Sequence, residues 1–240
     1  KRSGQGSGMI SPADSERYCA GGYLPASFLD WDGHVAAVVF TPGCNFRCPW
    51  CHNSELVLGK SEMLDLGRII DDIRRRRDFL DGVVLTGGEP SLWIGLLDFL
   101  RKMKELEIKV KLDTNGSMPR VLERVLEEGL AAHVAMDVKS PLDRSSLKRV
   151  TGVDADPDAI RSSISIIKKA APSYEFRTTF IEDILTIEDM KKIREELDDD
   201  PHWVIQPFRP VSCLDPSFSS RPPADAGKLR EEFPGIRVRG

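Results

Sequence analysis

The sequence lacks long apolar runs and carries little net charge. None of its apolar stretches is long enough to cross a bilayer, and the amino-terminal region has no apolar core of a signal peptide. The formal net charge is only −4, so the charge gives no reason to expect binding to nucleic acid or to an anionic membrane. With 240 residues, 40% of them hydrophobic, the chain can still bury a sizeable core. We therefore expect a globular protein that binds neither membrane nor nucleic acid.

Cysteine is also scarce, and its distribution argues against a disulfide framework. The chain has five cysteines; three lie between positions 44 and 51, while Cys19 and Cys213 stand apart. An odd total with three clustered residues fits metal binding in a reducing cytoplasm better than disulfides. We expect Cys213 to be a plain buried thiol, with a resolving or substrate-contacting role as the alternative. We expect no role for Cys19.

The three clustered cysteines are the strongest signal in the chain. Cys44, Cys48 and Cys51 have the spacing CxxxCxxC on a loop that contains glycine and proline. Three thiolates can hold one soft metal centre and leave one position of a four-iron cluster, or of a tetrahedral ion, without a protein ligand. An open position indicates chemistry, because a structural site closes itself with four ligands.

Two other interpretations of this loop stay open. Zinc could bind the three thiolates with His52 as the fourth ligand, or an electron-carrying iron–sulfur centre could recruit the distant Cys213. A zinc ribbon normally has two CxxC knuckles, and this chain has one. Trp50, between the last two cysteines, could pack in the core or place its aromatic face near the metal and its ligand.

Strand and helix patterns alternate along the chain. Six strands are predicted, at residues 35–41, 82–86, 108–113, 132–138, 174–181 and 203–208. Helices are predicted at residues 64–79, 91–105, 118–129, 157–171 and 186–198. This alternation is typical of repeated βα units with right-handed crossovers around a parallel sheet, so we expect an α/β fold.

Three of the predicted strands carry mostly polar residues at every second position. A parallel strand that is covered on both faces is apolar throughout, and these are not. The alternating side chains are Lys109, Lys111 and Asp113; His133, Ala135, Asp137 and Lys139; and Glu175, Arg177 and Thr179. We therefore predict a partial (β/α)6 barrel with a polar lumen. The alternative is that these are edge strands that face solvent.

We divide the chain into four segments and find no linker between two domains. Residues 1–8 are rich in glycine and serine, and we interpret them as a flexible linker or a remnant of cloning. Residues 9–34 are an N-terminal extension, and residues 35–210 form the barrel. Residues 211–240 are a C-terminal tail that we expect to pack on the barrel.

Unusual sequences follow four of the predicted strands. The cysteine loop follows the first strand, residues 87–89 (Gly-Gly-Glu) follow the second, residues 113–116 end the third, and Asp137 and Lys139 end the fourth. Ligands of α/β proteins bind at the carboxyl ends of the strands, so we expect these four segments to converge on one site.

Each of these strand-end motifs also has a simpler interpretation. The two glycines of residues 87–89 could form only a turn, or they could let the backbone approach a ligand closely. Burial of Asp113 beside Asp137 would be costly unless Lys139 or a small cation neutralised the pair. The four arginines at residues 74–77 suit the solvated carboxyl end of a helix, with a docking patch for an acidic partner as the alternative.

Together these motifs resemble the radical S-adenosylmethionine (SAM) superfamily. The cysteine loop, with Trp50 as its aromatic residue, is similar to the cluster loop of that superfamily, and residues 87–89 match its Gly-Gly-Glu motif. Further segments are similar to the activating proteins of anaerobic ribonucleotide reductase, which are glycyl-radical enzyme activating enzymes. These segments are residues 21–25, 30–36, 51–53, 136–139, 175–179 and 206–210, and the likeness spans roughly residues 20–216.

The resemblance implies a role for each motif. Cys44, Cys48 and Cys51 would hold three irons of a [4Fe–4S] cluster, with SAM on the fourth iron. Other contacts to SAM, or for the two arginines to SAM or the incoming substrate, are implied for Trp50, His52, Gly87, Gly88, Glu89, Thr114, Asn115, Lys139, Arg177 and Arg209. A site for a monovalent cation is implied for Asp113, Thr114, Asp137 and the carbonyl of Ala135.

The implied reaction is the reductive cleavage of SAM. An electron donor similar to flavodoxin or ferredoxin would reduce the cluster, and electron transfer to the sulfonium would break a carbon–sulfur bond and form a 5′-deoxyadenosyl radical. In the glycyl-radical branch, this radical takes a hydrogen from a backbone glycine of a partner enzyme such as anaerobic ribonucleotide reductase. The alternatives are a radical SAM reaction on another peptide or small molecule, and a non-catalytic iron–sulfur or zinc protein.

Overall fold

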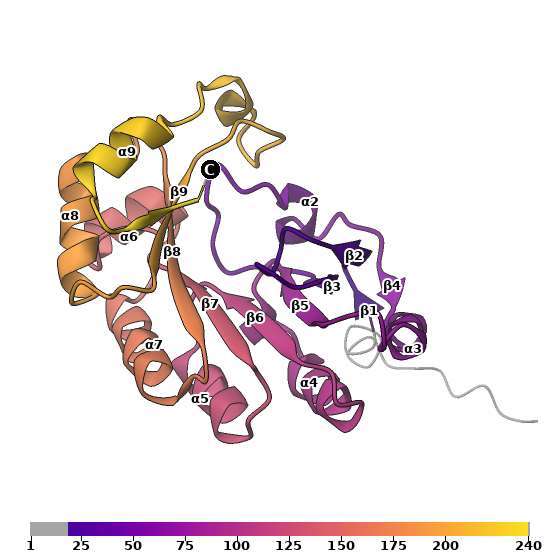
Figure 1. Ribbon diagram of the computed structural model, residues 1–240. Helices are drawn as coiled ribbons and strands as arrows, with labels where there is room; N and C mark the ends of the chain where they lie inside the picture. Colours follow the sequence, from indigo (N-terminus) through magenta and orange to yellow (C-terminus); the bar gives the residue numbers. More distant parts are fainter. Residues whose placement is uncertain (1–18, 240) are drawn as a thin grey trace, which may run out of the picture.

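The computed structural model describes residues 19–239, which build one strongly curved sheet with helices around its outer side (Figure 1). The predicted linker and the first part of the predicted N-terminal extension lie outside the described residues. The strand order is β10-β9-β8-β7-β6-β5-β3-β2. All neighbours from β3 to β10 pair in parallel, and β2 pairs antiparallel to β3. The predicted α/β class is confirmed.

All six predicted strands are present within two residues of the expected bounds. They are β3 (Ala36–Thr41), β5 (Gly82–Gly87), β6 (Val110–Thr114), β7 (His133–Asp137), β8 (Tyr174–Phe180) and β9 (Trp203–Pro207). The sequence pattern does not predict the two edge strands, β2 (Gly22–Ser27) and β10 (Arg237–Val238). The first contains glycine and proline, which are depleted in strands, and the second is too short to show a period. A separate small sheet pairs β1 (Cys19–Ala20) with β4 (Leu64–Asp65).

The longer helices cover the outer face of the sheet (Figure 1). The helices are α2 (Ser54–Val57), α3 (Leu66–Arg75), α4 (Leu96–Glu105), α5 (Pro119–Glu127), α6 (Arg144–Thr151), α7 (Pro157–Ala170), α8 (Ile187–Glu196) and α9 (Ala226–Glu232), with 3-10 turns η1 (Pro90–Leu92) and η2 (Pro216–Ser220). All five predicted helices occur. Helix α3 starts later than predicted, because the Asp65 side chain accepts a hydrogen bond from Arg68 N–H and caps it there. Among residues 19–239, no helix combines the length and the apolar character that crossing a bilayer requires.

The two faces of the sheet differ in character. The outer face is apolar and packs against the helices through Val110, Leu112, Val134, Met136 and Phe176. On the inner face Lys111 and Glu175 are only 3% and 8% exposed. Strands β6, β7 and β8 each have a partner on both sides, so the edge-strand alternative is wrong. The polar residues line the inside of the curved sheet, as predicted.

The loop between β2 and β3 closes the lumen at the end where the strands begin. Trp31 packs with Ala36, Val38 and Val84, and its ring stacks on His34. The neighbouring Asp32 contacts two arginines at the opposite edge of the sheet, Arg237 and Arg239. These ion pairs link the two edges of the open sheet, although the edge strands do not pair with each other within the described residues.

Candidate active site

The cysteine loop leaves the end of β3, and segments far away in the sequence hold it in place. Arg47 N–H donates to Thr151 O at the end of α6 (2.7 Å), and Leu214 N–H donates to Cys51 O (2.9 Å). Gly152 follows α6 with φ of 72°, and a Cβ at this position would lie 2.8 Å from Arg47 O. Helix α6 and the C-terminal tail therefore position the loop, although the sequence pattern does not predict α6.

The three cysteines of this loop line one cavity of about 230 Å³ and form no disulfide. Burial raises the pKa of Cys48 to about 11, although the Lys139 ammonium opposes this shift. Burial also raises the pKa of Cys44. Because the thiolate is the form that binds metal, metal binding here would release protons.

Among residues 19–239, no three side chains of His, Cys, Asp or Glu gather closely enough to hold a single metal ion. In an iron–sulfur cluster each thiolate binds a different iron, so its ligands lie farther apart than around one tetrahedral ion. Cys44, Cys48 and Cys51 line one cavity, and three thiolates are the donor set of a cluster with one open iron.

Residues 87–89 pack tightly against the cysteine loop. Gly88 N–H donates to Thr41 O (2.9 Å), and Glu89 N–H donates to Gly43 O (2.8 Å). A Cβ on Gly88 would lie 1.7 Å from Gly43 O, and Gly87 has φ of 116°, which side chains other than glycine rarely adopt. Both glycines are therefore required by the close approach of the two loops.

The Glu89 carboxylate is buried and ties the end of β5 to the end of β6. Its Oε1 accepts hydrogen bonds from Ser91 N–H (2.9 Å) and Thr114 Oγ1 (2.8 Å), and its Oε2 accepts one from Asn115 N–H (2.7 Å). Burial raises the pKa of Glu89, and these hydrogen bonds oppose the shift. Glu89 therefore acts on the site by positioning Thr114 and Asn115.

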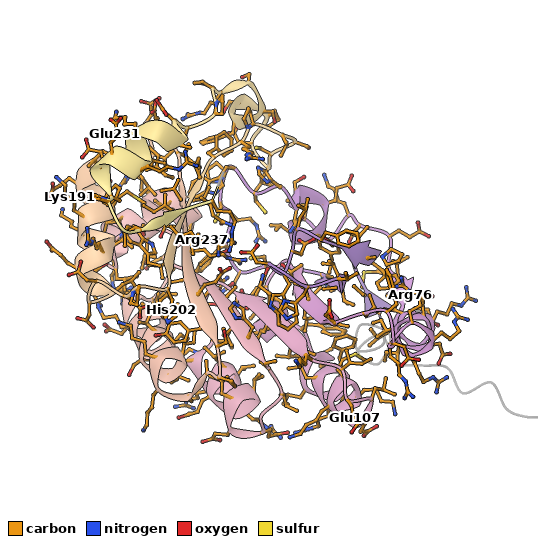
Figure 2. All side chains as sticks on the ribbon, in the orientation of Figure 1. Arg76, Glu107, Lys191, His202, Glu231 and Arg237 are labelled. Carbon is orange, nitrogen blue, oxygen red and sulfur yellow. The ribbon has the colours of Figure 1, made fainter. Side chains whose placement is uncertain are left out.

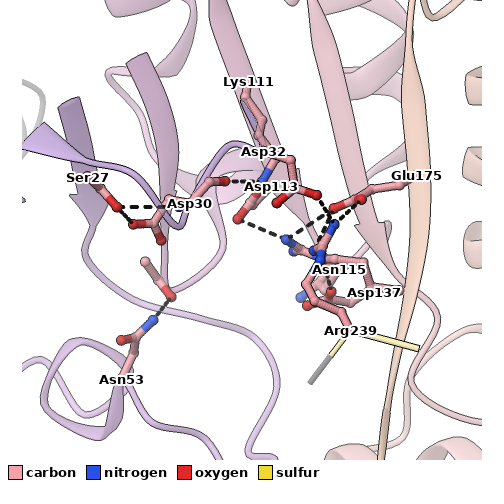
Figure 3. A network of polar contacts seen from close by, with 12 residues as sticks. Ser27, Asp30, Asp32, Asn53, Lys111, Asp113, Asn115, Asp137, Glu175 and Arg239 are labelled. Carbon is pink, nitrogen blue, oxygen red and sulfur yellow. Dashed lines mark hydrogen bonds and ion pairs between the residues drawn. The ribbon is translucent and has the colours of Figure 1, made fainter. Parts of the chain in front are cut away.

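A layer of paired charges lies beside the thiols. Arg177 Nε is 2.9 Å from Asp137 Oδ1, and Arg177 Nη1 is 3.3 Å from Asp113 Oδ2. Lys139 Nζ is 3.1 Å from Asp137 Oδ2, and Lys111 Nζ is 3.0 Å from Asp113 Oδ1. Burial by itself would raise the pKa of Asp137, but Arg177 and Lys139 outweigh it and lower the pKa to about 2. Figure 3 shows the two carboxylates within this network.

The cavity brings most of the predicted site residues together. Its lining includes Cys44, Cys48, Trp50, Cys51, His52, Gly87, Gly88, Glu89, Asp113, Thr114, Asn115, Asp137, Lys139 and Arg177. Arg209 is exposed and is not part of this lining, although its backbone bonds to the His52 ring. Ala135 is buried on β7 and is also outside the lining.

The lining also contains residues to which the sequence pattern assigns no role, namely Phe46, Asn53, Val57 and Thr86. Asn53 Nδ2 donates to Gly87 O (2.8 Å) and so joins the end of the cysteine loop to the glycine turn. Its place directly after the last cysteine and His52 is the signal that could have identified it. Cys213 is buried, its thiol donates to Val211 O (3.2 Å), and neither it nor Cys19 lines the cavity.

Comparison with protein families gives this site its context. The family model described as the radical SAM superfamily matches residues 38–198. The chain belongs to the radical SAM superfamily. It is 33% identical over 217 residues, 88% of both chains, to a Methanocaldococcus jannaschii protein that bears the name "Putative glycyl-radical enzyme activating enzyme".

Two further similarities are shorter or structural. The chain is 34% identical over 137 residues to a Sulfurisphaera tokodaii protein named "Probable GTP 3′,8-cyclase", a match that covers 55% of this radical SAM chain and 42% of the cyclase. The crystal structure of Streptococcus suis SuiB bound to precursor peptide SuiA aligns with a TM-score of 0.67 at 14% identity. That alignment covers 85% of this chain and 48% of SuiB, and it shows a shared fold.

The described residues fit the cofactors that membership of the radical SAM superfamily implies, a [4Fe–4S] cluster and SAM. Three unpaired thiols that line one cavity are a donor set for a cluster with one open iron. The Lys139 ammonium lies in the same lining and suits a carboxylate ligand.

Proposed function

We propose that this radical SAM enzyme generates a glycyl radical on a partner enzyme, with anaerobic ribonucleotide reductase as the first candidate. The observation that carries the proposal is the 33% identity to the Methanocaldococcus jannaschii protein over 88% of both chains. The cyclase match covers less than half of the cyclase, so it supports the shared SAM chemistry and not a shared substrate. We further propose an electron donor of the flavodoxin or ferredoxin class and an anoxic cytoplasm as the setting.

Different residues of the chain would bind the cluster and SAM. A bound cluster and SAM would supply a one-electron reduction that yields a 5′-deoxyadenosyl radical. Cys44, Cys48 and Cys51 would hold the cluster, and Lys139 would hold the carboxylate of SAM. Glu89 would position the backbone at the end of β6, where we place the methionyl and ribose contacts. The buried side chain of Trp50 would exclude water from the radical.

The position of the cavity supports a substrate that reaches in from outside. The cavity, of about 230 Å³, lies at the carboxyl ends of the strands. A cluster and SAM would use this space. Figure 2 shows side chains within the region that the sheet encloses. Trp31 packs with Ala36, Val38 and Val84 near the end where the strands begin. A hydrogen donor would therefore have to reach in from the mouth of the cavity, as a flexible loop of a partner enzyme can do.

Two measurements test this proposal in sequence. The protein is reconstituted without oxygen, its iron and sulfide are measured, and SAM and dithionite are added. We expect 5′-deoxyadenosine above a control without SAM, and its absence from a fully loaded protein would defeat the enzyme assignment. A candidate reductase is then added and the glycyl radical is sought by electron paramagnetic resonance. SAM cleavage with no radical on any glycyl-radical reductase tested would favour the alternative, a radical SAM reaction on another substrate.

A further inference from the structure

The two aspartates at the ends of β6 and β7 would need a counterion near any bound SAM, and the chain supplies its own. The side chains of Asp113 and Asp137 are only 15% and 29% exposed, and their negative charges lie at neighbouring strand ends. The guanidinium of Arg177, 12% exposed, contacts both carboxylates. It spans the gap between the strand ends, where a small cation shared by the two carboxylates would have to bind.

The other charges of this layer make an additional cation unfavourable. Lys111 neutralises Asp113 and Lys139 neutralises Asp137, and with Arg177 three protein cations face these two carboxylates and the more distant Glu175. A further positive ion would be repelled by all three in surroundings that water screens poorly. One carboxylate oxygen, Asp113 Oδ1, has no well-directed hydrogen bond, but the Lys111 ammonium lies 3.0 Å from it.

The Thr114 hydroxyl, which is also expected in a cation site, is engaged elsewhere. Thr114 Oγ1 donates to Glu89 Oε1 (2.8 Å) and accepts from Gly116 N–H (3.1 Å). These two contacts use the hydroxyl proton and one of its two lone pairs, and they fix the orientation of the lone pair that a hard cation would need. The predicted set of Asp113, Thr114, Asp137 and the carbonyl of Ala135 therefore does not fit a monovalent cation in this structure.

Further charged residues on β8 and near the C-terminus hold Arg177 in place. Glu175 Oε1 lies 4.0 Å from Arg177 Nη1, and Arg239 Nη2 lies 2.7 Å from Glu175 Oε2. Arg239 also contacts Asp32, so the chain of contacts continues to the loop that closes the lumen (Figure 3). Contacts on several sides hold the guanidinium in place, as the coordination of a bound ion would.

We infer that Arg177 replaces a monovalent cation as the counterion of the Asp113–Asp137 pair, so that this protein binds SAM equally well with and without potassium or sodium. The inference rests on the SAM site of the proposed function and not on the glycyl-radical partner. It assigns Arg177 to charge balance and positioning, in place of the contact with SAM or substrate that the sequence resemblance implies.

The test measures SAM affinity in the cluster-loaded protein. SAM binding is followed through the change it causes in the electron paramagnetic resonance spectrum of the reduced cluster, at constant ionic strength, in choline chloride and in potassium chloride or sodium chloride. We expect the dissociation constant to differ by less than about twofold between the salts, whereas a difference of about tenfold or more in favour of potassium or sodium would overturn the inference. An ion that bound to the apoprotein would stabilise the fold and raise the melting temperature. Since we expect no ion to bind, the melting temperature should be the same in all three salts.

Substitution of Arg177 sharpens the test. Arg177→Gln should weaken SAM binding by about tenfold in choline, and potassium or sodium should restore much of it because the two carboxylates then have room for an ion. Arg177→Lys, which keeps a positive charge, should remain insensitive to the salt. Failure of either ion to rescue Arg177→Gln would show that the guanidinium does not stand in for a cation.

Control outcomes separate this inference from the proposed function. Arg101→Gln removes an arginine that pairs with Glu128 on the helical surface, and it should change neither SAM affinity nor its salt dependence. Salt-independent SAM binding without a glycyl radical on any partner would defeat the proposed function and leave the inference standing. No SAM binding in any salt would overturn both.

Discussion

The inner face of the sheet has two halves that serve the site in different ways. On β3 and β5 most inward side chains are apolar, and Ala36, Val38 and Val84 pack around Trp31. On β6 to β8 the inward side chains are charged and paired, as Asp113 and Arg177 show. The apolar half contributes through its backbone, since the cysteine loop and the Gly-Gly-Glu turn follow its strands. The charged half contributes electrostatics. Substitutions in the apolar half should therefore affect cluster binding and stability, and substitutions in the charged half should affect SAM affinity.

The largest effect should come from substitution of a cysteine in the loop that follows the apolar half. Cys48→Ala should reduce the iron and sulfide of the reconstituted protein to background, because two thiolates cannot hold the same cluster. Cys213→Ala is the matched control, since Cys213 is equally buried at 7% exposure but does not line the cavity. It should retain its iron. Loss of iron from Cys213→Ala would make Cys213 a ligand and revive the closed, non-catalytic site.

A methyl group on Gly88, in the turn that follows the apolar half, should destabilise the protein through a steric clash. The added Cβ would lie 1.7 Å from Gly43 O, so the two loops must separate, and we expect Gly88→Ala to lower the free energy of unfolding by about 3 kcal/mol or more. Urea unfolding of the apoprotein measures this. Gly59→Ala is the control: Gly59 also has positive φ (65°) but has no atom within 4 Å of an added Cβ, so only the backbone cost of about 1–2 kcal/mol should appear. Equal losses would show that packing against Gly43 is unimportant.

A substitution in the charged half should spare the cluster and affect SAM. Asp137 holds Lys139 at 3.1 Å and Arg177 at 2.9 Å. Asp137→Ala therefore frees Lys139, leaves Arg177 with Asp113 and the more distant Glu175, and disturbs the carboxylate-binding side of the cavity. We expect normal iron and sulfide with SAM affinity weakened by about tenfold, or about 1.4 kcal/mol. The SAM-induced change in the spectrum of the reduced cluster reports the affinity. An unchanged dissociation constant would mean that the charged layer is not part of the SAM site.

Local patterns could be predicted from the sequence, and contacts between distant segments could not. The strands appear in local patterns of β-branched and alternating residues, and the residues at their carboxyl ends meet because parallel strands align those ends. The contact of helix α6 with the cysteine loop joins Thr151 to Arg47, which lies far away in the sequence, so no local pattern reports it. The resemblance places Arg209 at the site, yet the side chain is exposed, because a motif gives the identity of a residue and not its direction. Arg239 meets Glu175 across 64 positions of sequence, and no periodicity reports such a pair.

The smallest effect should come from that last pair, which lies in the charged half but away from the cavity. Arg239 Nη2 is 2.7 Å from Glu175 Oε2, and the Glu175 side chain is only 10% exposed. Because Arg177 at 4.0 Å still compensates Glu175 after Arg239→Gln, we expect a loss of only about 1 kcal/mol, or a melting temperature lower by about 2–4 °C. A double-mutant cycle with Glu175→Gln should give a coupling of at least about 0.5 kcal/mol, and a coupling of zero would remove the pair from the account. SAM affinity should stay constant, since Arg177 keeps both aspartates. A parallel fall in SAM affinity would instead show that the closed end of the lumen and the SAM site are coupled through Glu175, so that the charged half acts as one unit from the C-terminal strand to the cavity.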